Sequence, residues 1–200
     1  MEEKTRFYYK ELPENYIQDY VIDGRNKKTG LMMTFLFFGL WITTFAICEA
    51  FFGFNFSMKF DLLRAALASI IFIASYIVMI ILHELIHGLF NKIFTREKLT
   101  FGFGKGSAYC GAPEVYIKKG AKMVVAMAPF FTFSIALITA LIFIKDPFYY
   151  LLVSIFLGLH IGGCSGDLVE FFILLFKYHG KKVLVNDIGP VQTIYVEKKQ

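Results

Sequence analysis

The stretch IIFIASYIVMIILHELIHGLF, residues 70–90, is a long apolar run with two histidines and a glutamate near its end. Such a run is typical of a helix that crosses a lipid bilayer. Ionisable side chains are costly in hydrocarbon, so His83, Glu84 and His87 require an explanation. Either they bind a group that compensates their polarity, or they are interfacial residues that pack between helices.

The composition of the whole chain agrees with a membrane location. Of 200 residues, 56% are hydrophobic, and the mean hydropathy is +0.57, well above ordinary globular usage. We therefore predict an α-helical integral membrane protein. The three cysteines, Cys48, Cys110 and Cys164, form no CxxC pattern, so we expect buried thiols and no disulfide framework.

Four apolar runs organise the chain, and each exceeds the roughly 20 residues that span a bilayer. The predicted helices are about 31–52, 62–90, 121–144 and 148–176, and Pro129 interrupts the third. Aromatic and small residues alternate in the loop 95–120, which predicts a β-hairpin. The predicted organisation is an N-terminal flank 1–30, a membrane domain 31–176 and a C-terminal tail 177–200 whose two short strands surround a turn at 187–190.

Basic residues mark three segments that would share one side of a four-helix arrangement. Arg64, near the opposite end of the second helix, is a minor exception. Because positive charge favours the cytoplasmic side, we predict a multi-pass cell-membrane protein with both termini cytoplasmic. These residues are expected to contact anionic lipid, not nucleic acid. They are Lys4, Arg6, Lys10, Arg25, Lys27 and Lys28; Arg96, Lys98, Lys105, Lys118 and Lys119; and Lys177, Lys181, Lys182, Lys198 and Lys199.

The sequence HELIH, residues 83–87, matches the pattern H-E-x-x-H. Positions i and i+4 lie on one face of a helix, so His83 and His87 can present ring nitrogens to one metal ion. Glu84 is then the candidate general base, which takes a proton from water and passes it to the leaving amine. Zn²⁺ suits such a site because it accepts nitrogen and oxygen ligands and leaves a position open.

A third ligand is expected from the fourth helix, in the stretch HIGGCSGDLVE. At roughly 1.5 Å per residue, His83 and Asp167 both lie about 30 Å from the outer ends of their helices. His160 lies roughly 10 Å further up the axis. Asp167 is therefore the predicted ligand, and Gly162, Gly163 and Gly166 would allow a close approach of the helices.

The other polar residues of this helix have less specific interpretations. Asp167 itself could instead bond to helix ends or to Lys177. His160 is either a hydrogen-bonded residue within the bundle or a group that contacts substrate or supports the site. Glu170 is expected beside the site or at an interface, and Cys164 is expected to be a small packing residue.

Together, HELIH in a membrane helix, the segment FGFGKGSAYCGAPEVYIKKG, the Ala-Pro of MAPF and HIGGCSGDL resemble the bacterial family called putative zincin peptidases, which is distantly similar to the site-2 proteases. The resemblance covers roughly residues 16–176. It implies His83, His87 and Asp167 as ligands and Glu84 as base. It also implies a strand-forming loop, 100–117, that pairs with an extended substrate. Around Asp167 the chain has Ser-Gly-Asp-Leu where the site-2 pattern has Asn-Pro-Asp-Gly.

The sequence thus predicts a zinc metallopeptidase that acts on a membrane-associated peptide or protein near the cytoplasmic membrane face. The alternative is a membrane protein without catalysis, either metal-binding or accessory. Glu84 separates the two, because hydrolysis requires it and metal binding does not.

Overall fold

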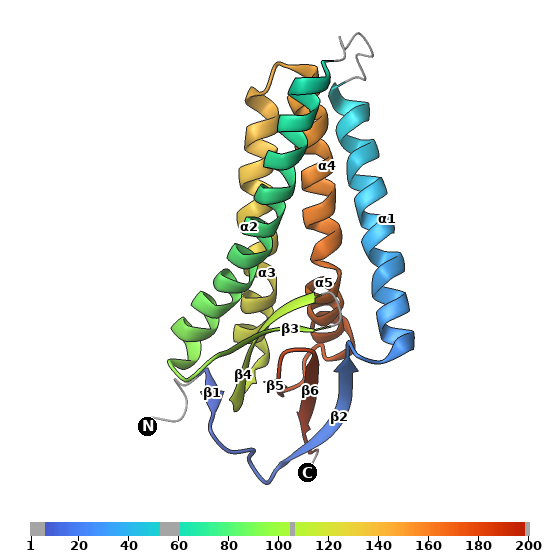
Figure 1. Ribbon diagram of the computed structural model, residues 1–200. Coiled ribbons are helices and arrows are strands. Elements are labelled where there is room, and N and C mark those ends of the chain that lie inside the picture. Colours follow the sequence, from blue (N-terminus) through green and yellow to red (C-terminus); the bar gives the residue numbers. More distant parts are fainter. Residues whose placement is uncertain (1–6, 53–60, 105–106, 199–200) are drawn as a thin grey trace. The chain divides into compact units, whose positions relative to one another are not determined.

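The computed structural model describes residues 7–52, 61–104 and 107–198. The connection 53–60, the turn of the predicted hairpin at 105–106 and both extreme ends of the chain lie outside these residues. The helices are α1 Lys27–Phe52, α2 Leu62–Thr95, α3 Lys119–Phe143, α4 Pro147–Gly163 and α5 Ser165–Phe172, and a π-helical turn follows at Ile173–Lys177. Strands occupy β1 Tyr8–Tyr9, β2 Tyr16–Asp23, β3 Thr100–Gly104, β4 Ser107–Lys118, β5 Val183–Asp187 and β6 Val191–Glu197 (Figure 1).

The chain divides into two compact units. Unit 1 comprises Met1–Met32, His83–Pro129 and Gly166–Gln200, and unit 2 comprises Met33–Leu82 and Phe130–Ser165. The helix α2 is continuous from one unit into the other.

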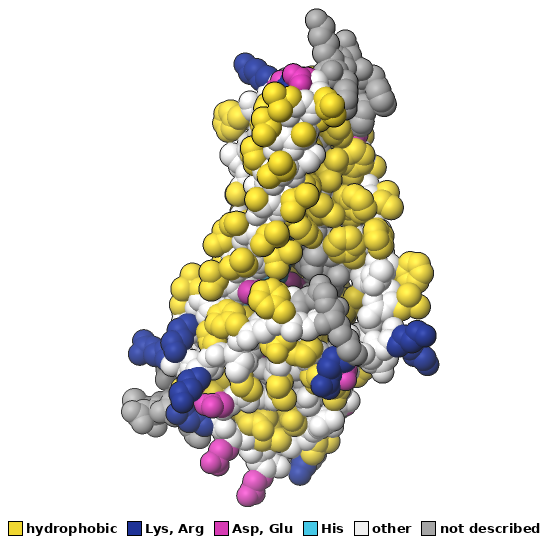
Figure 2. Space-filling view, in the orientation of Figure 1, with side chains coloured by type: hydrophobic (Ala, Val, Ile, Leu, Met, Phe, Trp, Pro, Cys, Tyr) yellow, Lys and Arg dark blue, Asp and Glu magenta, His cyan; other side chains and the backbone are white. Residues whose placement is uncertain are grey.

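Unit 2 consists of helical segments with apolar surfaces. Its core contains Cys48, Leu141, Tyr150 and Leu157, and the Tyr150 hydroxyl donates to the carbonyl of Cys48 at 2.8 Å. Large apolar side chains also lie exposed; Ile70, for example, keeps 66% of its surface accessible. Hydrophobic side chains cover the visible face of these helices (Figure 2). An apolar surface of this extent requires an apolar partner or lipid.

Three helices, α1, α2 and α3, are long and apolar enough to cross a membrane. The count becomes four if α4 and α5 together form one interrupted span. The described residues therefore form a mostly helical protein with a small antiparallel sheet, as predicted. All three cysteines are buried and free, which confirms the expectation of buried thiols.

Three details of the helices differ from the predictions. The fourth helix, predicted as one run over about 148–176, is divided at Cys164 into α4 and α5. The second helix continues past residue 90 to Thr95, whose hydroxyl donates to the carbonyl of Asn91 at 2.8 Å. The residue after its end, Arg96, has a positive φ of 57°. The predicted interruption at Pro129 is wrong, because α3 is continuous around this residue. A proline removes only one main-chain hydrogen bond of a helix, and the rest of α3 tolerates that loss.

Unit 1 is built around an antiparallel sheet with the strand order β1-β4-β5-β6-β2. The first part of β4 also pairs with β3, which confirms the predicted hairpin. The predicted C-terminal strand pair is present as β5 and β6. The segment before α1 was predicted as a flank, but it supplies β1 and β2, and β2 pairs with β6 (Figure 1). The pattern did not reveal β2 because most of its side chains are exposed.

An irregularity in β4 shapes the centre of the sheet. The register with β5 shifts between Ala112 and Ile117. The side-chain amide of Asn186 spans this shift and donates to the carbonyls of Pro113 and Val115, both at 2.9 Å. Buried carbonyls of the bulge thus keep hydrogen-bond partners.

Candidate metal centre

Three predicted ligands converge in unit 1. His83 and His87 lie one turn apart on α2, and Asp167 lies in the first turn of α5. The Nε2 atoms of His83 and His87 are 3.1 Å apart. The Asp167 carboxylate reaches both rings, with Oδ2 at 3.2 Å from Nε2 of His83 and Oδ1 at 3.3 Å from Nε2 of His87. One ligand atom from each residue therefore faces a common point.

These distances fit a zinc ion. With zinc–nitrogen and zinc–oxygen bonds of about 2 Å, two ligands of a tetrahedral site are about 3.3 Å apart. The 3.1 Å between the two nitrogens lies within a few tenths of an ångström of that value, and each Asp167 oxygen lies at a similar distance, 3.2 or 3.3 Å, from one of them. Two imidazoles and one carboxylate also form the donor set of a catalytic zinc site, which leaves the fourth position for water or substrate. His83, His87 and Asp167 thus have the geometry and chemistry to hold the ion.

The orientation of His87 is set by a main-chain contact. Its Nδ1 lies 2.9 Å from the carbonyl oxygen of Val125 on α3. A carbonyl only accepts, so Nδ1 carries a hydrogen, and in the neutral ring the lone pair of Nε2 faces His83 and Asp167. A metal-ligating imidazole needs this tautomer, and donation to a carbonyl commonly fixes it.

Glu84 follows the first histidine on α2 and is half-buried. Its carboxyl group lies within electrostatic range of His83, His87 and Asp167. This position next to the ligand cluster suits a group that exchanges protons with a molecule held there.

A buried lysine beside the cluster was not foreseen from the sequence. Lys122 on α3 is 3% exposed. It makes a short hydrogen bond and ion pair with Asp187 on β5, and its Nζ lies 3.4 Å from Oε2 of Glu170 on α5. Lys122 therefore links α3 with β5 and with the helix that carries Asp167. In the sequence, Lys122 could have been noticed as the one charged residue within the apolar stretch AKMVVAMAPFF.

The remaining candidates occupy different surroundings. Glu170 lies one turn after Asp167 on α5 and is 1% exposed, paired with Lys122. His160 belongs to unit 2, where its Nε2 lies 3.4 Å from the carbonyl of Phe130 and its ring contacts Phe133 edge-on. Cys164 lies near His160, with its sulfur 3.9 Å from Nδ1.

Cys110 on β4 is a further buried thiol in unit 1. Burial, with the nearby carboxylates of Glu84 and Asp187, raises the pKa of the Cys110 thiol to about 12. The thiol is therefore protonated at neutral pH. Zinc binds the thiolate form of cysteine, so Cys110 is a poor ligand.

The hairpin β3–β4 passes close to Gly88, the residue after the candidate ligand His87. A Cβ atom at Gly88 would lie 2.8 Å from Cζ of Phe101 on β3. Within the described part of the chain, β3 pairs with β4 alone. The other edge of β3 therefore has no strand partner among the described residues, and Phe101 and Phe103 are 52% and 79% exposed.

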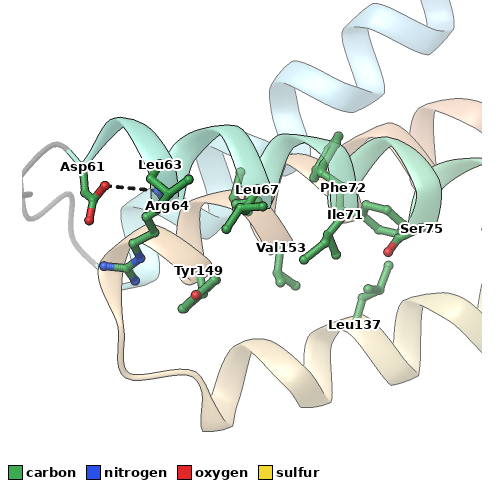
Figure 3. Close-up of a pocket in the computed structure, with 13 residues that line it drawn as sticks. Asp61, Leu63, Arg64, Leu67, Ile71, Phe72, Ser75, Leu137, Tyr149 and Val153 are labelled. Atoms are coloured by element: carbon green, nitrogen blue, oxygen red, sulfur yellow. Dashed lines mark hydrogen bonds between the residues drawn. The ribbon is translucent and has the colours of Figure 1, made fainter.

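Unit 2 contains a separate groove of about 650 Å³ between α2, α3 and α4. Figure 3 shows Arg64 and Tyr149 at one end and Leu137 and Ser75 at the other. Arg64 pairs with Asp146 at 2.7 Å, and its guanidinium lies 4.7 Å from the Tyr149 ring centroid. Among the described lining residues there is no histidine or cysteine. The groove is an apolar surface feature and lacks the donors of a metal centre.

A comparison with protein families found a match that includes the candidate ligands. A family model described as "Putative zincin peptidase" matches residues 76–181, more than half of the chain. The match includes His83, Glu84, His87 and Asp167, and it excludes the four strands formed by the ends of the chain. No curated protein and no solved structure matches the chain.

Proposed function

The chain belongs to the family of putative zincin peptidases, and from that premise we propose that it is a membrane-embedded zinc metallopeptidase. It hydrolyses peptide bonds near the cytoplasmic membrane face. The observation that carries the proposal is the convergence of two Nε2 atoms and one carboxylate on a common point, beside Glu84.

His83, His87 and Asp167 would hold the zinc ion. When bound, zinc supplies Lewis acidity, which lowers the pKa of a water molecule and polarises a peptide carbonyl. The single carboxylate among the three residues would compensate part of the ion's two positive charges, and the two rings would be neutral ligands. This compensation explains why ionisable groups are tolerated at the end of an apolar helix.

Glu84 has the role of general base. It accepts a proton from the attacking water and returns it to the leaving amine. No ligand position requires Glu84, so its presence between the two histidines favours an enzyme over a metal-binding protein without catalysis.

The edge of β3 is the proposed docking place for substrate. A peptide bond in a helix is closed to attack, whereas an extended peptide exposes its carbonyls. Pairing with β3 would hold a substrate in that form, because an open strand edge presents main-chain donors and acceptors. The closeness of Phe101 to Gly88 supports this, since it brings the strand next to His87. The substrate is accordingly a membrane-associated peptide or protein segment that is locally unfolded.

The lipid bilayer is the proposed environment of the apolar helices. Their length and exposed apolar side chains support insertion. The pairing of β2 with β6 supports termini on one side of the membrane. A reporter fused after Gln200 is expected to report the cytoplasm, and an external signal would contradict this topology.

The test of the proposed activity is Glu84→Gln, with Glu114→Gln as its matched control. Glu114 is an exposed glutamate on β4. In detergent or liposomes, Glu84→Gln should retain zinc and lose hydrolysis of an unstructured peptide library, read out by mass spectrometry. Glu114→Gln should retain both. Full hydrolysis by Glu84→Gln would refute the proposal, and a wild-type protein that binds zinc without hydrolysis would favour the non-catalytic alternative.

A further inference from the structure

The carbonyl of Val125 has an unusual position in the hydrogen-bond pattern of α3. In an α-helix each carbonyl accepts from the N–H four residues later. Four residues after Val125 stands Pro129, inside α3, and proline has no N–H. The carbonyl of Val125 therefore lacks its helical donor. Val125 is 1% exposed, so its main-chain oxygen requires a partner from the protein.

His87 supplies that partner. Its Nδ1 lies 2.9 Å from the Val125 oxygen, and its side chain is buried, with 7% of the residue exposed. The proline ring also contributes, because it crowds the carbonyl of the residue four positions earlier and tilts it away from the helix axis. The Val125 oxygen lies within hydrogen-bond distance of an imidazole on α2.

The geometry points to Pro129 as a positioning residue for the metal site. By removing one N–H from α3, it frees the Val125 carbonyl to hold the hydrogen on Nδ1 of His87. In the neutral ring Nε2 is then left without a hydrogen, and it lies 3.1 Å from Nε2 of His83 and 3.3 Å from Oδ1 of Asp167. The inference rests on the proposed zinc site, and it concerns the orientation and tautomer of one ligand.

A second proline of the chain provides a matched control. Pro147 stands at the start of α4. A residue in the first helical turn has no intrahelical acceptor for its N–H, so proline there frees no carbonyl. Pro129→Ala and Pro147→Ala therefore make the same chemical change, and only the first restores a competing donor to Val125.

Pro129→Ala should have two opposite effects: it should raise the thermal stability of the metal-free protein and lower its affinity for zinc. A helix with alanine at this position is more stable than one with proline, so the thermal midpoint of the metal-free protein should rise. The restored N–H draws the Val125 carbonyl back toward the helix axis. Loss of a group that orients a ligand weakens metal affinity about 10- to 100-fold, measured here by zinc competition with a chelator. Pro147→Ala should bind zinc as the wild type does.

Nitrogen-15 NMR of the histidine rings in the metal-free protein gives a readout independent of zinc. In the wild type, at a pH alkaline enough to keep the ring neutral, His87 should show a protonated Nδ1 and a bare Nε2, and Pro129→Ala should show a mixture of both tautomers. Unchanged zinc affinity and an unchanged tautomer in Pro129→Ala would overturn the inference. An unfolded Pro129→Ala variant, or an equal loss of affinity in Pro147→Ala, would also contradict it.

Failure of the zinc proposal would look different. A wild-type protein that binds no zinc would refute the proposed function. The His87 tautomer in the two proline variants would still decide whether Pro129 frees the Val125 carbonyl for that ring.

Discussion

Two buried histidines, one in each unit, have opposite surroundings. His87 in unit 1 donates to the Val125 carbonyl and turns its other nitrogen toward a second imidazole and a carboxylate. His160 in unit 2 is 1% exposed and lies against aromatic rings and a carbonyl at 3.4 Å. Burial of a histidine therefore does not by itself identify a metal ligand. The convergence of several donor atoms makes His87 the candidate ligand of the two.

The same contrast extends to the rest of each unit. In unit 1, charged side chains compensate one another within a folded sheet-and-helix body, as Lys122 does with Asp187 and Glu170. In unit 2, the helices carry exposed apolar side chains and a groove without histidine or cysteine among its described lining residues. In the proposed function, unit 1 would carry the chemistry and unit 2 would contact lipid.

The largest expected effect separates the two histidine environments directly. His83→Ala removes one of the three proposed ligands, so zinc content and peptide hydrolysis should fall to background. His160→Ala should retain stoichiometric zinc, measured by elemental analysis of the purified proteins. If His160→Ala also lost its zinc, the separation of the two environments would be incorrect.

The next effect concerns stability and compares two lysines on α3. Lys122→Met leaves Asp187 and Glu170 buried without their cation, which costs about 3–5 kcal/mol. Lys119 donates to the carbonyl of Tyr178 at 2.9 Å, so Lys119→Met should cost only about 1 kcal/mol. Equilibrium unfolding in detergent measures both. Equal losses of unfolding free energy in the two variants would show that the buried ion pairs of Lys122 stabilise the fold no more than the hydrogen bond of Lys119 does.

A smaller effect tests the close approach of β3 to α2. In Gly88→Ala the new methyl group must displace the ring of Phe101, whose Cζ lies 2.8 Å from the Cβ position. A loss of about 1 kcal/mol in substrate binding raises KM about fivefold, with zinc content unchanged. Gly39→Ala on α1 is the control, since no atom of the described residues lies within 4 Å of its Cβ position. A KM unchanged by Gly88→Ala would argue against β3 as the docking edge.

The smallest effect is a rate of chemical modification. With a pKa of about 12, the Cys110 thiol is almost entirely protonated at pH 7. Alkylation by iodoacetamide should therefore be slow, and it should speed up about tenfold per pH unit as thiolate forms. Mass spectrometry follows the modification, with the denatured protein as the fast reference. Rapid alkylation of the folded protein at pH 7 would place Cys110 in a more open environment.

Local patterns in the sequence were sufficient to predict the apolar helices and the candidate ligands. The apolar runs reveal helices by length alone. The spacing of His83 and His87 places both on one helix face, and the depth argument selects Asp167 from a different helix. The structure brings the three together, with separations of 3.1–3.3 Å.

Contacts between distant segments were not predictable in this way. Lys122 and Asp187 are separated by 65 positions in the chain, and neither carries a motif. The strand β2 has mostly exposed side chains, so it lacks the alternation that reveals a strand. The proposed role of Pro129 was also not predictable from the sequence. It depends on a missing N–H donor in α3, and only the structure shows His87 Nδ1 at the Val125 carbonyl.

The central claim is that His83, His87 and Asp167 form one zinc site. It is tested most directly by measuring zinc stoichiometry and affinity for the wild type, Asp167→Ala and Glu170→Gln under the same conditions. We predict one tightly bound zinc in the wild type and in Glu170→Gln, and a large loss of affinity in Asp167→Ala. Zinc bound by Asp167→Ala as tightly as by the wild type would contradict the claim.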